Sequence, residues 1–383
     1  MSILLFLSFI TLIFIGFPVA WTMGGLAVLF TLITMLSDSY LDTFFGVDWK
    51  FSSMVVYRLY GVMANWVLVA LPMFIFMGIM MDKSGIAEDL MTDLAKLFGR
   101  MRGGLAIAVV FIGVLLAAST GIIGASVVLL TILGVPLMLK NNYNPDLACG
   151  VVCATGTLGI LIPPSIMLVI MGDQVRISVG DLFMGAVFPG LMLGLLYTIF
   201  IIAYAYLKPK VAPAPKSAEP VSLDIILRVF KSIIPPALLI IAVLGSIFMG
   251  IATPTDAGAV GCVATFILTM LSGRMCFLKI KKCIMSTLEI SSMILLLVTT
   301  SNLFGAVFSR LGSADLIANL LTSLPVSPMV LLILILLLIF LLGWPLEWVP
   351  IVLIVVPIFL PIIKTAGIDL IWFTTLVALT LQT

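Results

Sequence analysis

Histidine is missing from this sequence, and charged residues make up only 9% of its 383 residues. Without histidine, the chain lacks the commonest metal ligand and the side chain that ordinarily exchanges protons near neutral pH. Lysine and arginine number 19 against 17 aspartates and glutamates, so no basic excess is available for binding nucleic acid. A glycine-rich phosphate loop ending in Lys-Ser or Lys-Thr is also missing, which argues against ATP as the energy source.

Cysteine is scarce, and the five cysteines lie in or beside apolar segments. Cys149 and Cys153 share one helical face without a nearby histidine or carboxylate, so they are predicted to be small packing residues of the core. The chain also lacks a nucleophile and base at a recognisable spacing. We therefore predict no catalytic residue, no cofactor and no metal other than Na⁺, and we do not expect an enzyme.

Hydrophobic residues, by contrast, make up 63% of the chain, and its mean hydropathy of +1.34 is typical of a polytopic membrane protein. A spanning helix needs about 20 apolar residues. The segments that qualify are 18–36, 55–81, 145–172, 181–207, 225–250, 255–273 and 283–308. Met1–Ile15 is shorter, and is either a thin first pass or one arm of a helix kinked at Gly16.

Two further apolar segments, 104–138 and 328–361, have the wrong length for spanning helices. Each would measure roughly 50 Å as a straight helix, which is too long for one pass and too short for two. Breaks fall near their middles, at Ser119-Thr120-Gly121 in the first and at Gly343-Trp344-Pro345-Leu346-Glu347 in the second. Both are predicted to be re-entrant helical hairpins.

The span 145–172 contains the motif Ala-Thr-Gly-Thr-Leu-Gly-Ile-Leu-Ile-Pro-Pro-Ser at residues 154–165. Glycine weakens a helix and proline cannot donate a backbone hydrogen bond, so Pro163 and Pro164 are predicted to hold a break open. A membrane tolerates such a break only where protein or a polar cavity covers it, and transporters use such breaks to hold ions and anions.

The break and the first hairpin tip together suggest a Na⁺ site, because this hard cation takes oxygen ligands. The predicted ion-binding residues are Ser119, Thr120, Gly121, Thr155, Gly156, Thr157 and Gly159. The alternative is that the glycines and prolines only permit a kink or close helix packing. Ser165 is placed to cap the next half-helix and to bind substrate.

Basic residues cluster in 99–103, 208–231 and 274–282, which places these segments in the cytoplasm. The two hairpins then enter from opposite sides, as inverted repeats require. The predicted domains are a first repeat at 1–207, a linker at 208–224 and a second repeat at 225–383. A shift of 225 places Thr120 on Pro345 and Thr155 on Thr380. The same shift carries the Pro-Pro pair past Thr383, so we expect an incomplete second broken span and a truncated chain.

Polar residues at membrane depth are further functional candidates. Gly343 and Pro345 are predicted to break the second hairpin, and Thr380 to contribute to a second ion site. Glu347, Ser301 and Asn302 are predicted substrate contacts, although hydrogen bonding between helices is the slightly favoured explanation of the polar run 299–302. Asp256, which opens a span, is either an N-cap or an ion ligand. The segment 83–96 is predicted to be an amphipathic arm at the membrane interface.

The motif at 156–165 resembles the signature of the large permease subunit of TRAP (tripartite ATP-independent periplasmic) transporters, as does Gly-Ile-Ala-Thr-Pro-Thr-Asp-Ala at 250–257. The Ser-Thr-Gly hairpin tip and the long 38–53 loop look like the mannitol/chloroaromatic branch of this family. The resemblance implies a bacterial inner-membrane protein with an elevator mechanism. It also implies a small four-helix membrane subunit and a periplasmic substrate-binding protein as partners.

We therefore expect an all-α polytopic membrane protein with two inverted repeats, re-entrant hairpins and broken helices. Its expected function is Na⁺-coupled import of a small organic acid anion, such as a 2-oxo acid or another carboxylate. H⁺ coupling is the alternative. An ion channel is the other rival, because re-entrant loops also build selectivity filters.

Overall fold

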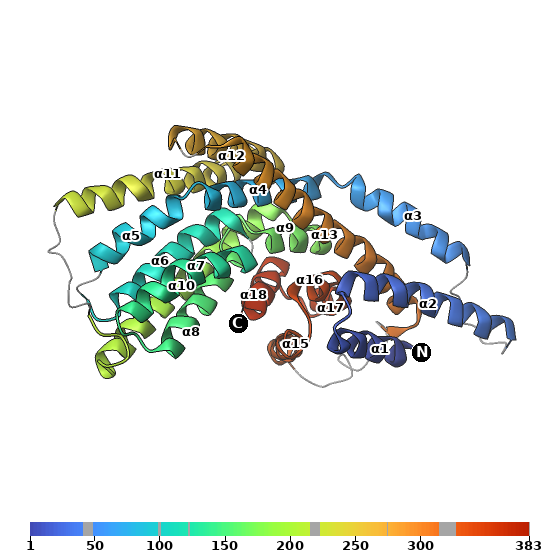
Figure 1. Ribbon diagram of the computed structural model, residues 1–383. Helices are drawn as coiled ribbons and strands as arrows, with labels where there is room; N and C mark the ends of the chain where they lie inside the picture. The colour runs from blue at the N-terminus through green and yellow to red at the C-terminus, as the bar shows by residue number, and fades with distance from the viewer. Residues whose placement is uncertain are drawn as a thin grey trace. The chain divides into compact units, whose positions relative to one another are not determined.

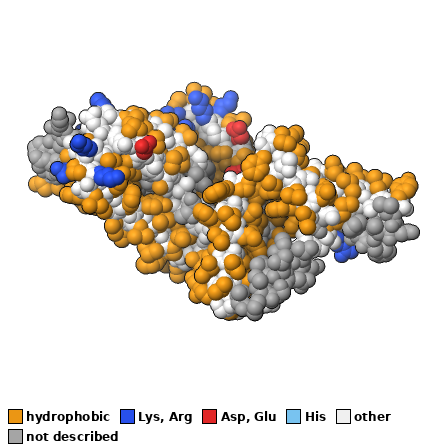
Figure 2. Space-filling view, turned by 90° about the horizontal axis from the view of Figure 1, so that it is seen from below, with side chains coloured by type: hydrophobic (Ala, Val, Ile, Leu, Met, Phe, Trp, Pro, Cys, Tyr) orange, Lys and Arg blue, Asp and Glu red, His pale blue; other side chains and the backbone are white. Residues whose placement is uncertain are grey.

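The computed structural model describes residues 1–40, 49–98, 101–121, 123–214, 223–273, 275–313 and 327–382. Within these ranges all regular secondary structure is helical (Figure 1). Seven of the described helices are long and apolar enough to cross a membrane. Hydrophobic side chains cover most of the face that Figure 2 shows, as expected of a surface in contact with lipid. The predicted all-α polytopic fold is confirmed.

The chain divides into two compact units. Unit 1 contains residues 1–68, 170–177 and 290–381, and unit 2 contains residues 69–169, 178–289 and 382–383. Both units therefore draw on both halves of the sequence.

Unit 2 holds the first predicted hairpin and the first predicted broken span. Two antiparallel helices, α6 (Gly104–Thr120) and α7 (Ile123–Lys140), pack against each other and against α8 (Pro145–Gly156). Figure 1 shows α6, α7, α8 and α10 side by side. The remaining helices of unit 2 are α4 (Ala70–Lys83), α5 (Ile86–Phe98), the 3-10 helix η2 (Thr157–Ile160), α10 (Val179–Leu207), α11 (Leu223–Phe248) and α12 (Pro254–Leu271).

Unit 1 holds the second predicted hairpin, in which α15 (Pro328–Leu342) packs against the π-helix η3 (Ile351–Val355). Its other helices are α1 (Ser2–Ile15), α2 (Val19–Tyr40), α3 (Trp49–Met63), α16 (Trp348–Pro350), α17 (Val356–Thr365) and most of α18 (Leu370–Gln382). Three further helices have residues in both units: the 3-10 helix η1 (Trp66–Val69), α9 (Ile166–Val175) and α13 (Phe277–Arg310).

The predicted single span at 55–81 is wrong, because the chain leaves the helix between α3 and η1. The Asn65 side chain accepts a hydrogen bond from Val67 N at 3.1 Å and donates one to Asp173 Oδ1 at 2.6 Å. An asparagine that bonds locally in this way offers the backbone an alternative to the helix. At the N-terminus, α1 and α2 are separate helices, because Gly16 ends α1 with a φ of 99°.

Cys149 and Cys153 are exposed on α8, so their prediction as core residues is wrong. Apolarity does not place a residue in the interior here, because the outer surface of a membrane protein is apolar too. In α5, Ile86, Leu90 and Leu94 are buried while Glu88 and Asp89 are exposed, so the helix is amphipathic.

Asp256 is not the N-cap of α12, which is Thr253. Thr253 Oγ1 accepts a hydrogen bond from Asp256 N, and the Asp256 carboxylate accepts from Thr253 N and Thr253 Oγ1. This reciprocal capping box satisfies backbone donors at the start of the helix.

We expect Asp256→Ala to lower the stability of the protein, because it removes half of the capping box. Loss of a cap costs about 1 kcal/mol, which a thermal unfolding curve detects. The response of the melting temperature to Na⁺ should be unchanged. A variant that keeps its stability but loses its Na⁺ response would instead identify Asp256 as an ion ligand.

Candidate functional site

The first broken span is interrupted inside unit 2. Helix α8 ends at Gly156, η2 continues to Ile160, and the next helix starts at Ile166 after a cis peptide between Pro163 and Pro164. Residues 158–172 are all buried. The non-helical backbone is therefore covered by protein, which is the condition for a break at membrane depth.

Ser165 bridges the two sides of the break with its hydroxyl. Its hydroxyl donates to the Ile160 carbonyl at 2.5 Å and accepts from Leu168 N at 3.4 Å. The side chain is fully buried. Its hydroxyl is thus committed to the break and to the first turn of α9, as expected of a cap.

The first hairpin tip lies directly against the break. Gly121 has a φ of +60°, and a Cβ at this residue would lie 3.0 Å from the Pro164 carbonyl oxygen. The tip and the broken helix, both predicted to belong to one ion site, are thus in contact. Ser119 and Thr120 form the last turn of α6, but their side chains lie outside the described part of the structure.

Thr155 differs from the other threonines of the helices. Thr31, Thr269 and Thr287 are buried and donate their hydroxyls to the carbonyl four residues earlier, at 2.7–2.8 Å. Thr155 is 0% exposed, and its Oγ1 has no hydrogen-bond partner within the described ranges. A buried, unpaired hydroxyl costs about 1–3 kcal/mol, so its presence points to a partner such as an ion or water.

Thr157 lies at the start of η2, where its hydroxyl donates to the Ala154 carbonyl at 2.9 Å. The same oxygen accepts a hydrogen bond from Nε2 of Gln382 at 3.2 Å. That nitrogen also lies 3.1 Å from the Tyr197 hydroxyl. All three residues belong to unit 2. The neighbouring Gly156 and Gly159 are buried.

Tyr197 and Gln382 were not predicted from the sequence. Nothing in the local pattern of α10 distinguishes Tyr197 from its apolar neighbours. Gln382 did carry a signal, because it lies 225 residues after Thr157, the shift at which the two hairpin breaks superpose.

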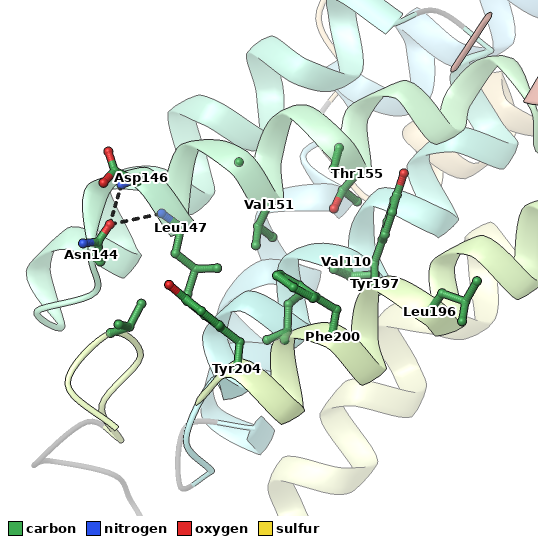
Figure 3. A pocket seen from close by; sticks show the side chains of 14 residues that line it. Val110, Asn144, Asp146, Leu147, Val151, Thr155, Leu196, Tyr197, Phe200 and Tyr204 are labelled. Carbon is green, nitrogen blue, oxygen red and sulfur yellow. Dashed lines mark hydrogen bonds between the residues drawn. The ribbon is translucent and has the colours of Figure 1, made fainter. Parts of the chain in front are cut away.

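A cavity of about 640 Å³ reaches this region of unit 2 (Figure 3). Thr155 and Tyr197 line the cavity, together with Asn144 and Asp146 at the start of α8. Its walls between these polar groups are largely apolar, with Val151 and Phe200 among them. The cavity connects the unpaired hydroxyl region with the polar residues at the N-terminal end of α8.

Unit 1 contains the other predicted site residues. Ser301 is fully buried and its Oγ has no partner among the described residues, whereas Thr299 and Thr300 donate to carbonyls four residues earlier. The Asn302 carbonyl accepts a weak hydrogen bond from Arg58 at 3.4 Å. Thr380 donates to the Leu376 carbonyl at 2.8 Å.

The second hairpin of unit 1 turns where α15 ends. Gly343 is the C-cap of α15, Pro345 lies in the turn, and Glu347 precedes α16. Near the first hairpin of unit 2, burial raises the pKa of Tyr143 to about 12, and its hydroxyl accepts from Leu105 N. Tyr143 is therefore neutral at physiological pH.

An apolar helical chain with a covered break and a hairpin against it has the architecture of a secondary membrane transporter. The family model of the tripartite ATP-independent periplasmic transporter, DctM component, matches residues 6–383. The chain belongs to this family, and it is a multi-pass protein of a bacterial inner membrane.

Several curated relatives support this assignment. The chain is 36% identical over 264 residues to the C4-dicarboxylate TRAP transporter large permease protein DctM of Vibrio cholerae, covering 69% of this chain and 54% of the relative. Identity to the DctM of Pseudomonas aeruginosa is 32%, over 82% of this chain and 72% of that protein. The 2,3-diketo-L-gulonate TRAP transporter large permease protein YiaN of Escherichia coli is 28% identical, over 97% of this chain and 84% of the relative. The matched region thus spans about half the length of the first relative.

Among solved structures, the YdaH transporter of Alcanivorax borkumensis has a similar fold. The TM-score is 0.59 at 16% sequence identity, covering 87% of this chain and 76% of that chain. The similarity supports the fold alone.

We expect Gly121→Ala to destabilise the protein, because an L-residue at this left-handed φ costs about 1–2 kcal/mol. The added methyl group would also press on the Pro164 carbonyl. Gly124→Ala is the matched control, since Gly124 is a helical residue of α7 at which an added Cβ would meet no atom from outside its own helix within 4 Å. The melting temperature of the Gly124→Ala variant should stay the same as that of the wild type or rise. Equal effects of the two substitutions would contradict a close contact between the tip and the break.

Proposed function

We propose that the chain is the large membrane subunit of a Na⁺-coupled, binding-protein-dependent importer of a small organic acid anion. A 2-oxo acid or another carboxylate is the proposed substrate. The names of the V. cholerae, P. aeruginosa and E. coli relatives specify C4-dicarboxylates and 2,3-diketo-L-gulonate, which are all organic acids. A small four-helix membrane subunit and a periplasmic binding protein are the proposed partners.

The main observation that supports Na⁺ coupling is the unpaired hydroxyl of Thr155. This oxygen is fully buried beside the break, and the Thr155 residue lines a cavity large enough for an ion and its waters. A hard monovalent cation uses hydroxyl and carbonyl oxygens, and the hairpin tip at Gly121 brings further backbone groups to the same break. Na⁺ is therefore the proposed partner of this oxygen.

The substrate site is proposed to include Ser301, whose buried hydroxyl is unpaired in the same way as that of Thr155. Anionic substrates are attracted by helix N-termini in broken helices, and Asn302 and Glu347 would contribute specificity. Movement is proposed to follow an elevator mechanism, with the amphipathic helix α5 as the arm. A hydrogen bond of 2.8 Å from Ser232 Oγ to Asp93 Oδ2 links this arm to α11.

Thr155→Val tests the Na⁺ site, because it replaces the hydroxyl by a methyl group of similar size. In K⁺ the variant should be as stable as the wild type or more stable, since an unpaired buried hydroxyl is lost. Exchange of K⁺ for Na⁺ at constant ionic strength should raise the melting temperature of the wild type by mass action, by an amount equivalent to about 2.7 kcal/mol at a hundredfold excess over Kd. The variant should lose this rise.

The matched control is Thr269→Val, which removes the paired hydroxyl of a buried helical threonine in the same unit. It should cost about 0.5–1.5 kcal/mol in K⁺ and keep the full Na⁺ response. A wild type that shows no Na⁺ response would favour H⁺ coupling. Uptake in proteoliposomes completes the test: a Na⁺ gradient should drive accumulation of labelled 2-oxo acids or C4-dicarboxylates above equilibrium, which a channel cannot do.

A further inference from the structure

The direction of the hydrogen bonds at Thr157 fixes the orientation of the Gln382 amide. The hydroxyl hydrogen of Thr157 goes to the Ala154 carbonyl, so its oxygen can only accept from Gln382. In a glutamine amide the nitrogen donates and the oxygen accepts. The nitrogen must therefore face Thr157, and Oε1 must point to the other side of the amide plane.

The Oε1 atom of Gln382 is left without a partner. Gln382 is 5% exposed, and its Oε1 is buried and makes no hydrogen bond to any described residue. Two buried oxygens of this region, Thr155 Oγ1 and Gln382 Oε1, thus lack a partner among the described residues. Tyr197 links the two residues, because it lines the same cavity as Thr155 and accepts a hydrogen bond from Gln382 Nε2. Each of the two oxygens would cost about 1–3 kcal/mol if it stayed unpaired. Both oxygens carry free lone pairs that a cation can use as ligands.

The sequence positions of Thr157 and Gln382 independently support a role for Gln382 at the break. Thr157 and Gln382 are 225 residues apart, which is the offset between the two hairpin breaks. A contact between equivalent positions is expected near the axis that relates two inverted repeats. The oxygens at this point thus come from both repeats.

We propose that Gln382 and Tyr197 complete the cation site at the break, with Gln382 Oε1 as an additional ligand and Tyr197 as the residue that positions the amide. Tyr197 does so by accepting the second hydrogen bond of Nε2 at 3.1 Å. The side-chain oxygens of Thr155, Thr157 and Gln382 are all neutral, a set that suits a monovalent ion better than Ca²⁺ or Mg²⁺, which take carboxylates. The inference rests on the proposed function, because it takes Na⁺ as the ion.

The test is a Na⁺ titration of thermal stability, with K⁺ as the replacing ion, on the full chain purified with its small membrane subunit. Gln382→Leu removes the proposed ligand Oε1 and the hydrogen bond from Nε2 to the Thr157 hydroxyl. Tyr197→Phe removes a single oxygen and serves as the second variant if the first fails to fold. The Na⁺ concentration at half-maximal stabilisation should rise about 10–100-fold in Gln382→Leu and about 10-fold in Tyr197→Phe.

The controls are matched in chemistry. Gln174→Leu removes an amide bonded to Asp173, and Tyr206→Phe removes a hydroxyl from an exposed residue of the same helix α10. Both should leave the Na⁺ titration unchanged. A normal Na⁺ requirement in Gln382→Leu, with the response lost in Thr155→Val, would overturn this inference and leave the proposed function standing. Equal shifts in the controls would also overturn it, whereas no Na⁺ response in the wild type would overturn both.

Discussion

The structure depends on one constraint, which is that backbone groups at membrane depth need hydrogen-bond partners although no bulk water is available. At residues 161–165 the backbone is not helical, and the two prolines in this stretch have no N–H to donate. The chain compensates by burying the whole stretch and by using Ser165 to bond the Ile160 carbonyl. The hairpin tip at Gly121 closes over Pro164. The helices around the break in unit 2 therefore serve as its covering.

This compensation also explains why polar groups gather at the break. A helix that continues regularly consumes its own carbonyls and lets each threonine donate backwards, as Thr269 does. Where α8 gives way to η2, that pattern ends at Thr155 and Thr157. The Thr155 hydroxyl has no partner among the described residues, and the Thr157 hydroxyl, which still donates to the Ala154 carbonyl, also accepts from Gln382, whose amide reaches Tyr197.

Much of this arrangement could be predicted from the sequence, because proline, glycine and hydropathy act locally. The hairpin breaks at residues 119–121 and 343–347, and the break after Gly156, follow from the glycines and prolines in and near these segments. Asn65 was overlooked because its effect depends on Asp173, a partner more than a hundred residues away. Cys149 and Cys153 were misplaced because a membrane removes the contrast between an apolar interior and a polar surface. Tyr197 could not be predicted, since its role exists only through tertiary contacts.

The unpaired hydroxyl of Thr155 affects the local stability of α8 in the ion-free protein. Without a partner, the buried Thr155 hydroxyl destabilises the folded form of α8 around it. Local unfolding of this segment should therefore require less free energy than in the rest of unit 2. Amide hydrogens of α8 would then exchange with solvent faster in the empty protein than in the filled one. In the proposed transporter, the bound ion would hold α8 in place, and its release would let α8 open locally.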